Sequence, residues 1–149
     1  MTKIAIASDH GGYALKEALK EHLTRRGFEV IDLGADSDAP ADYPAYGKRC
    51  AEMVASGEAA RGVVCCGTGI GISIAANKTK GIRCALCTDT RMAELARKHN
   101  DANMLALGGR IVGAREAAEI VDVWLDTEFE DENRLDGRHR QRVASLNAM

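Results

Sequence analysis

Residues 62–78 read GVVCCGTGIGISIAANK, and the rest of the chain is organised around this stretch. It opens with the apolar run Val63 to Cys66, which has the length and composition of a buried strand. Glycines follow at three alternate positions, and residues 72–78 then read as a helix. A strand, a glycine loop and a helix form the geometry of an anion site, because glycines let backbone N–H groups approach a ligand and the helix N-terminus adds partial positive charge. Cys66 ends the strand, so we predict a thiol nucleophile or base beside that site.

On both sides of this stretch the chain alternates between short apolar runs and longer amphipathic ones. The apolar runs predict strands at residues 3–8, 29–33, 63–66, 83–87 and 104–107. The amphipathic runs predict helices at residues 13–26, 43–55, 72–78, 88–97 and 114–125, followed by a short final helix at 138–146. This alternation predicts an α/β protein, a doubly wound, Rossmann-like three-layer α/β/α sandwich around a five-stranded parallel sheet. The charged residues 127–137 are expected to be mobile or extended, so we predict a single domain over residues 1–149 with a C-terminal arm at 127–149.

The composition is that of an ordinary globular protein and excludes several classes. Apolar residues make up 46% and charged residues 28% of the 149, with a net charge of −2. The negative charge argues against a nucleic-acid or membrane surface, and the 4% of aromatic residues argues against a base-stacking platform. No apolar run approaches the roughly 20 residues of a membrane span, and Met1 leads straight into a strand without a signal peptide. Five cysteines in such a chain predict reduced thiols and a cytoplasmic location.

In a doubly wound sheet, ligands bind at the carboxyl ends of the strands. Asp9 and His10 follow the first predicted strand. Cys66 ends the third predicted strand, and Arg110 follows the fifth. The His-Asn pair at 99–100 precedes the fifth strand, so its placement depends on the fold. For either histidine alone, a surface or capping role stays open.

Other known uses of a glycine loop fit these residues poorly. The dinucleotide pattern G-x-G-x-x-G needs two residues between its last two glycines and normally follows the first strand, whereas Gly69 and Gly71 are separated by one residue and follow the third. A Walker A loop needs a Gly-Lys-Ser/Thr run that is absent. A thiol phosphatase would need an arginine six residues after the cysteine, where Ile72 stands. Tight packing without a ligand remains an alternative.

Two further patterns involve cysteine and arginine. Cys84-x-x-Cys87 resembles a redox pair, but residues three apart in a strand point to opposite faces, so we expect both to pack in the core. No spacing suggests a four-ligand zinc site, and no metal is predicted. Arg138 and Arg142 are four apart and share one side of a helix, which suits a phosphate and equally a solvated face.

Taken together, the motifs resemble the ribose-5-phosphate isomerase B family, which also includes galactose-6-phosphate and allose-6-phosphate isomerases. The resemblance covers nearly the whole chain, and the motifs match in order and spacing. They are SDHGG at 8–12, DYP at 42–44, CGTGIGISIAANK at 66–78, RKHNDAN at 97–103, GGR at 108–110 and GRHxxR at 137–142. The resemblance implies conversion of an aldose phosphate into a ketose phosphate through a cis-enediolate, without metal or cofactor.

The resemblance also implies roles for individual residues. Cys66 is the base that moves a proton between C2 and C1, Thr68 assists proton movement between the two oxygens, and His99 helps to open the furanose ring. Backbone N–H groups of the loop hold the enediolate charge, at Gly67, Gly69, Ile70 and Gly71. The remaining substrate-binding residues are Asp9 and Asn100 on sugar oxygens, Tyr43 and Ser73 nearby, and His10, Arg110, Arg138 and Arg142 on the phosphate.

Two departures within the family bear on this chain. Ile72 stands where some members carry a glutamate base, so the chain resembles the cysteine type. Residues 128–136 are several residues longer than in short members. Members form homodimers or homotetramers with active sites shared between subunits, and the charged arm fits a segment that reaches a partner. We therefore predict an isomerase of ribose 5-phosphate and ribulose 5-phosphate, with a six-carbon substrate (allose 6-phosphate or galactose 6-phosphate) and a non-catalytic sugar-phosphate sensor as alternatives.

Overall fold

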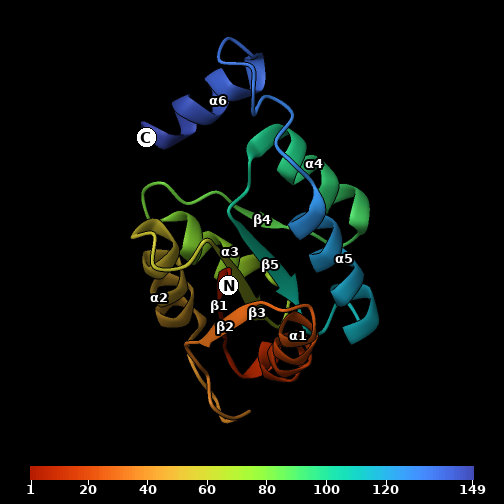
Figure 1. The fold of residues 1–149 in the computed structure, drawn as a ribbon. Helices are drawn as coiled ribbons and strands as arrows, with labels where there is room; N and C mark the ends of the chain where they lie inside the picture. The colour runs from red at the N-terminus through yellow and green to blue at the C-terminus, as the bar shows by residue number, and fades with distance from the viewer.

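Five strands form one parallel sheet in the order β2-β1-β3-β5-β4 in the computed structural model, which describes residues 1–149 (Figure 1). The strands are Lys3–Ser8 (β1), Glu29–Asp32 (β2), Arg61–Cys66 (β3), Cys84–Leu86 (β4) and Met104–Gly108 (β5). Ser8 lies opposite Cys65 in the β1–β3 pair, and Cys66 lies opposite Gly108 in the β3–β5 pair. The carboxyl ends of β1, β3 and β5 therefore lie next to one another.

Helices cover both faces of this sheet (Figure 1). One face carries α1 (Tyr13–Arg25), α4 (Thr90–Asn100) and α5 (Ala114–Asp126), and the other carries α2 (Tyr43–Ala55) and α3 (Ile70–Asn77). Successive strand residues point to opposite faces, so Ile4 packs with the first group of helices and Ala5 with the second. The predicted three-layer, doubly wound architecture is confirmed. None of the helices combines the length and the hydropathy needed to cross a membrane.

The cysteines follow the same alternation. Cys65 lies in the core beneath α1, α4 and α5, whereas Cys66 lies in the core beneath α2 and α3. Cys87 packs in the first of these cores and Cys84 against the second, as their spacing within a strand predicts. All five cysteines are free. The structural interpretation of Cys84-x-x-Cys87 is therefore confirmed.

Helix α4 extends three residues beyond its predicted end. It includes the His-Asn pair at 99–100, which we expected to follow the helix. The helix ends at Asp101, whose φ of 47° is left-handed. Two contacts extend the last turn, since the Asp101 N–H donates to the Arg97 carbonyl at 3.2 Å and the Arg97 guanidinium donates to the Asp101 carboxylate at 2.7 Å. The last turn of α4 is thus ordered by an ion pair across one helical turn.

The segment 127–137 connects α5 to α6. Residues 130–133 and 135–136 form turns, and the segment buries Phe129 and Asp131. The Glu130 N–H donates to the Lys98 carbonyl at 3.1 Å, which joins the segment to α4. The chain then enters α6 (Arg138–Asn147), which Figure 1 shows at the end of the molecule opposite the arrowhead of β5. Hydrogen bonds to α4, which is distant in sequence, therefore anchor this charged stretch, which the sequence led us to expect as mobile or extended.

Helix α1 is fixed to the sheet by a buried ion pair. The Lys16 side chain is fully buried, and its Nζ lies 2.8 Å from both carboxylate oxygens of Asp32 at the end of β2. Burial alone would raise the pKa of Asp32, but hydrogen bonds from the Lys16 and Lys20 ammonium groups outweigh it and lower that pKa. A buried lysine is tolerated here because its charge is paired and hydrogen-bonded.

Candidate active site

The loops that follow β1, β3 and β5 are joined by backbone hydrogen bonds. The Asp9 N–H donates to the Cys65 carbonyl at 3.2 Å. On the other side of β3, the Gly109 N–H donates to the Cys66 carbonyl at 2.8 Å, and the Arg110 N–H donates to the carbonyl of residue 67 at 2.9 Å. The three loops therefore form one continuous surface at the carboxyl ends of the strands, where a doubly wound fold binds ligands.

This surface requires glycine at two positions for different reasons. Gly12 lies in the short 3₁₀ turn η1 (His10–Gly12), and a Cβ there would lie 2.4 Å from the carbonyl carbon of Cys65. Gly69 has a φ of 80°, a left-handed conformation that strains any L side chain. The first glycine lets η1 pack against β3, and the second turns the chain from the loop into α3.

Cys66 lies at the centre of the loop. Its side chain is buried, and its Sγ accepts the Gly69 N–H at 3.1 Å, a contact suited to a sulfur that carries negative charge. Thr68 accepts the N–H of Ile70 on its Oγ1 at 3.1 Å. The N–H groups of Gly67, Thr68 and Gly71 donate to no other atom of the chain. These unpaired donors around a thiol form an anion site of the kind that the glycine spacing predicts.

The other four thiols differ from Cys66 in their surroundings. Burial raises the pKa of Cys50 and of Cys87 to about 12. It also raises the pKa of Cys65 and of Cys84. Burial away from opposite charge disfavours a thiolate, so these four behave as small apolar residues, three within the core and Cys84 packed against it. The loop cysteine is the candidate for chemistry.

Side chains from two other elements border the loop. The Tyr43 ring packs against Gly71, where an added Cβ would lie 2.6 Å from the ring. The Arg110 guanidinium packs against Gly67, where an added Cβ would lie 2.9 Å from its nitrogen. The Ser73 hydroxyl donates to a carbonyl in the first turn of α3 at 2.8 Å. An aromatic ring and a guanidinium thus lie against two glycines of the loop, and a hydroxyl is held in the first turn of α3.

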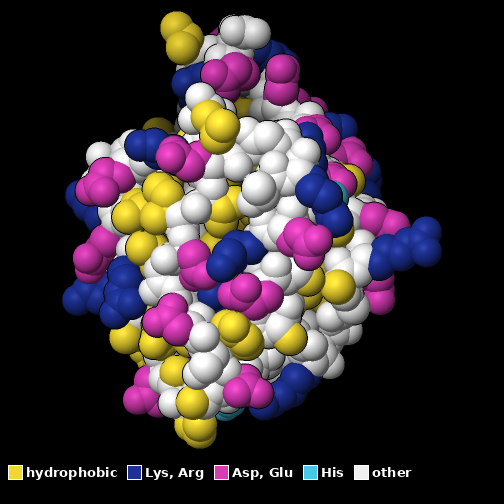
Figure 2. All heavy atoms as spheres, turned by 60° about the horizontal axis from the view of Figure 1, so that its bottom comes forward, with side chains coloured by type: hydrophobic (Ala, Val, Ile, Leu, Met, Phe, Trp, Pro, Cys, Tyr) yellow, Lys and Arg dark blue, Asp and Glu magenta, His cyan; other side chains and the backbone are white.

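The two residues after β1 complete this part of the site. The Asp9 carboxylate is buried and accepts the Gly12 N–H at 3.1 Å. The His10 Nδ1 lies 3.1 Å from the Ala41 backbone nitrogen, in the loop between β2 and α2. Both side chains are therefore oriented by backbone groups. Figure 2, which brings this end of the molecule forward, shows acidic and basic side chains intermingled rather than gathered into a field of one sign.

Four of the predicted site residues lie elsewhere in the same chain. His99 and Asn100 end α4, directly before the amino end of β5, and Arg138 and Arg142 lie on α6 beside them. At about 3.3 Å per residue, the five residues of β5 separate its two ends by roughly 16 Å. The structure therefore divides the predicted residues into two groups at opposite ends of the sheet, one around Cys66 and one around His99.

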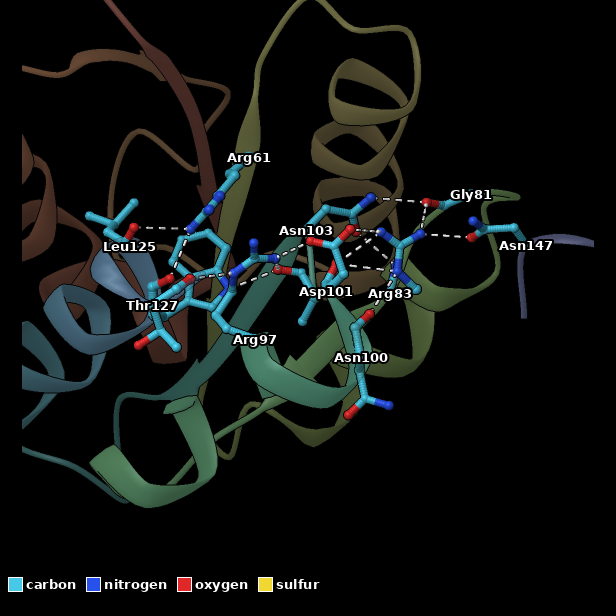
Figure 3. Close-up of polar contacts among 12 residues, drawn as sticks. Arg61, Gly81, Arg83, Arg97, Asn100, Asp101, Asn103, Leu125, Thr127 and Asn147 are labelled. Carbon is cyan, nitrogen blue, oxygen red and sulfur yellow. Dashed lines mark hydrogen bonds and ion pairs between the residues drawn. The ribbon is translucent and has the colours of Figure 1, made fainter. Parts of the chain in front are cut away.

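A network of arginines holds the end of α4 (Figure 3). The Arg83 guanidinium donates to the Asn100 carbonyl at 2.9 Å and to the Asp101 carbonyl at 2.9 Å. It also donates to the Asn147 side chain at 2.7 Å, which ties the end of α6 to the same place. The buried Arg97 donates to the Asp101 carboxylate and to the carbonyls of residues 102 and 127. These contacts fix the turn that presents His99 and its neighbour.

Helix α6 is positioned by a carboxylate that precedes it in the chain. The Asp131 carboxylate accepts the N–H groups of His139 at 2.8 Å and of Arg140 at 3.1 Å, which are orphan donors of the first turn. Burial alone would raise the pKa of Asp131, but these two N–H groups lower it. Gly137 leaves room for this contact, since a Cβ there would overlap the carboxylate. The His139 ring then stacks on His99 with the ring centroids 4.4 Å apart.

Comparison with known proteins identifies the family. A model described as Ribose/Galactose Isomerase matches residues 4–146. The chain belongs to the ribose/galactose isomerase family. It is 48% identical to the ribose-5-phosphate isomerase B of Escherichia coli K12, over the whole chain and 97% of that protein, and 49% identical to a putative sugar phosphate isomerase of Bacillus subtilis, over 97% and 94%. The structure of Clostridium thermocellum ribose-5-phosphate isomerase B superposes with a TM-score of 0.94 at 53% identity, covering 99% of this chain and 96% of that one.

Membership of the ribose/galactose isomerase family confirms the resemblance drawn from the motifs, and the fold agrees with it. Arg83, Asp131 and His139 help to hold this end of the chain, and none of the three was among the site residues predicted from sequence. Only His139 had a local signal, since it follows Arg138 within the last motif. Arg83 and Asp131 act through backbone groups, and no pattern of side-chain types marks such partners.

Proposed function

We propose that this ribose/galactose isomerase interconverts ribose 5-phosphate and ribulose 5-phosphate. The observation that carries the reaction class is the Cys66 thiol at the start of a loop whose N–H groups at Gly67, Thr68 and Gly71 are unpaired. The pentose assignment is supported by two relatives named ribose-5-phosphate isomerase B, one of them as probable, and by matching structures of the same name.

The proposed chemistry is a proton transfer without change in overall oxidation state. The Cys66 thiolate removes the proton from C2 of the open-chain aldose, which leaves a cis-enediolate, and it returns the proton to C1 of the ketose. Thr68 assists the movement of a proton from O2 to O1. The unpaired N–H groups stabilise the enediolate charge as it develops, and one such donor contributes about 3 kcal/mol to comparable transition states. Enediolate stabilisation is the main task because sugar α-protons are poorly acidic.

The substrate contacts come from two copies of the chain in this proposal. One copy supplies the loop with Asp9, His10, Tyr43, Ser73 and Arg110 around it. The second copy supplies His99 to open the furanose ring, Asn100 for a sugar oxygen, and Arg138 and Arg142 for the phosphate. The separation of roughly 16 Å between the ends of β5 supports this arrangement, because one chain cannot bring both groups to a pentose phosphate.

The surface around α3 and α6 supports a homodimer or homotetramer. Ile70 and Ile74 on α3 are each more than half exposed, and Leu146 on α6 is also exposed. A cavity of about 530 Å³ lies between residues 77–85, Asn100 and the end of α6. Exposed apolar side chains and an open cavity are both typical of interfaces. We propose that a second copy covers this face.

Two variants and a substrate comparison test the proposal. Cys66→Ala should lower kcat by about three orders of magnitude or more, since the base is removed. Cys50→Ala, which removes a thiol outside the loop and outside the cavity, should leave kcat within a few-fold. Near-normal turnover by Cys66→Ala would show that another group is the base. A chelator should leave the wild-type rate unchanged.

The same assay separates the alternatives. The kcat/KM for ribose 5-phosphate should exceed the values for allose 6-phosphate and galactose 6-phosphate. A six-carbon sugar with the highest value would keep the mechanism and change the substrate. Binding of all three without turnover would instead indicate a sensor.

We also propose that the protein works in a reducing compartment such as the cytoplasm. The five free cysteines support this, because four of them are fully or almost fully buried core residues whose oxidation would disturb packing.

A further inference from the structure

Three side chains that could bind a metal ion meet beside the end of α4. His99 lies in the last turn of α4, Glu130 in the turns before α6, and His139 in the first turn of α6. The two imidazole rings stack with centroids 4.4 Å apart and an interplanar angle of 10°. Glu130 Oε2 lies 2.9 Å from His139 Nε2. One ligand atom from each residue lies within 4.8 Å of the other two.

Backbone contacts hold these three residues together independently of their side chains. The Glu130 N–H donates to the Lys98 carbonyl at 3.1 Å, one residue before His99. The Asp131 carboxylate fixes the first turn of α6 by accepting the His139 N–H at 2.8 Å. The cluster is therefore built by the fold, and its members need little reorganisation to act together.

Two imidazole nitrogens and one carboxylate oxygen are a ligand set that binds Zn²⁺ with one coordination position left open. Metal–ligand distances of about 2.0–2.2 Å place tetrahedral ligand atoms roughly 3.3 Å apart, so the most distant pair must close by about 1.5 Å at most. Rotation of the imidazole rings about χ2, which is a soft torsion, supplies this movement and makes their lone pairs converge. The Glu130 side chain is 52% exposed, so it can adjust and gives an ion access from solvent.

We propose that His99, Glu130 and His139 bind a divalent ion of the Zn²⁺ type, and that this ion inhibits the enzyme. The inhibition follows because a metal on the His99 imidazole removes the group assigned to opening the furanose ring, and this part rests on the proposed function. The site is an inhibitory one, separate from any requirement for catalysis. The spacing of 31 and 9 residues between the ligands matches no sequence motif, which is why the sequence alone predicts no metal.

The chain provides a matched control for a simple histidine–carboxylate pair. His22 Nε2 lies 2.7 Å from the Asp122 carboxylate, much as His139 pairs with Glu130, but without a second histidine. The chain has four histidines in total, so few histidine sites compete for an added ion, and Cys66→Ala tests competition by the loop thiol. If the three-residue cluster is what binds, His22→Gln should behave as wild type.

Binding is tested first, with Zn²⁺ alone as the probe. Chelator-treated protein is titrated by calorimetry, and Co²⁺ absorption reports the coordination geometry. Wild type and His22→Gln should bind one ion per chain. Glu130→Gln and His139→Gln should each weaken Zn²⁺ binding by about 10-fold or more. Mutating a residue that only hydrogen-bonds to a metal ligand already changes metal affinity by 10–100-fold, and these two are proposed ligands themselves. Glu130 is exposed, and its substitution keeps the backbone hydrogen bond to Lys98. Circular dichroism checks that each variant is folded.

Activity is measured separately, each variant being compared with its own metal-free rate. Zn²⁺ should inhibit wild type, a chelator should restore the rate, and Glu130→Gln should need about 10-fold more Zn²⁺ for half inhibition. Equal Zn²⁺ affinity in wild type and in both cluster variants would overturn the proposal, as would loss of binding in Cys66→Ala alone, which would assign the ion to the thiol. Calorimetry tests the metal site even if no isomerase activity is found. Failure of the proposed function can therefore be distinguished from failure of the proposed metal site.

Discussion

Arg83 offers the sharpest test of how the His99 end of the chain is held. It lies just before β4, and its side chain is 14% exposed. Its guanidinium joins the Asn100 and Asp101 carbonyls at the end of α4 to the Asn147 side chain at the end of α6 (Figure 3). The prediction is that Arg83→Gln destabilises the fold and also impairs the reaction.

The size of the effect follows from these contacts. Each hydrogen bond from a charged donor contributes about 1.5–3 kcal/mol net, and glutamine can keep at most one of the three short ones. The bonds are not additive, and water will reach some of the freed carbonyls. Burial lowers the pKa of Arg83, because desolvation disfavours its charged form. Part of the free energy gained from its hydrogen bonds therefore offsets this desolvation cost. We therefore expect the free energy of unfolding to fall by about 2–4 kcal/mol.

Urea unfolding at one fixed protein concentration measures the stability change, and steady-state kinetics measures its consequence. We expect kcat/KM to fall by about 10–100-fold, because a loosened turn misplaces His99 and Asn100 relative to the substrate. Arg83→Lys keeps the charge but loses the planar fork, so it should recover only part of the loss. Arg91→Gln is the matched control, because Arg91 is exposed and its side chain hydrogen-bonds only to Glu94, at 3.3 Å.

Equal unfolding free energies for Arg83→Gln and Arg91→Gln would refute the reasoning. A loss of stability without any change in kinetics would limit the role of Arg83 to folding. A kinetic loss at unchanged stability would mean that the guanidinium acts on the substrate and not through the turn.

Two further predictions concern the β1 loop and the acid limit of stability. Gly12→Ala should lower the free energy of unfolding by about 3 kcal/mol or more, because its Cβ would lie 2.4 Å from the backbone of Cys65. Gly113→Ala is the control, since the nearest atom to its added Cβ is 3.8 Å away, and it should change the urea midpoint little. Asp32 has a pKa lowered in the folded state, so its contribution to stability is complete above its unfolded pKa of about 3.9 and is lost as the pH falls through the lower folded value. The melting temperature of Asp32→Asn should therefore be lower at neutral pH and depend less on pH below about 4, and an unchanged pH dependence would rule out the Lys16 pair as its source.

The sequence alone determined the features that depend on local pattern. Alternating apolar runs give β1 to β5, and the strand, glycine loop and helix around Cys66 follow from residues adjacent in the chain. Side chains at the carboxyl ends of strands, such as Asp9 and Arg110, could be assigned to one edge because parallel strands all end there. The family was equally visible, since its motifs are contiguous.

The tertiary structure alone decided the features that depend on residues far apart in the chain. The placement of β5 between β3 and β4 is set by packing and pairing, and it brings Arg110 beside the loop of Cys66. The same strand separates that loop from His99 by its own length. Charge and polarity suggested a mobile or extended stretch at 127–137. In the structure, the Asp131 carboxylate accepts N–H groups from the first turn of α6, and the Glu130 N–H donates to a carbonyl of α4.

Local sequence pattern specifies which face of an element is apolar and where that element ends, because both follow from the repeat of the backbone. It does not specify which distant donor meets which acceptor, because hydrogen bonds such as those of Arg83 and Asp131 to backbone groups use atoms that every residue carries. Hence the loop around Cys66 was determined by sequence, whereas the separation of His99 from it, and the meeting of His99 with Glu130 and His139, were decided only when the chain folded.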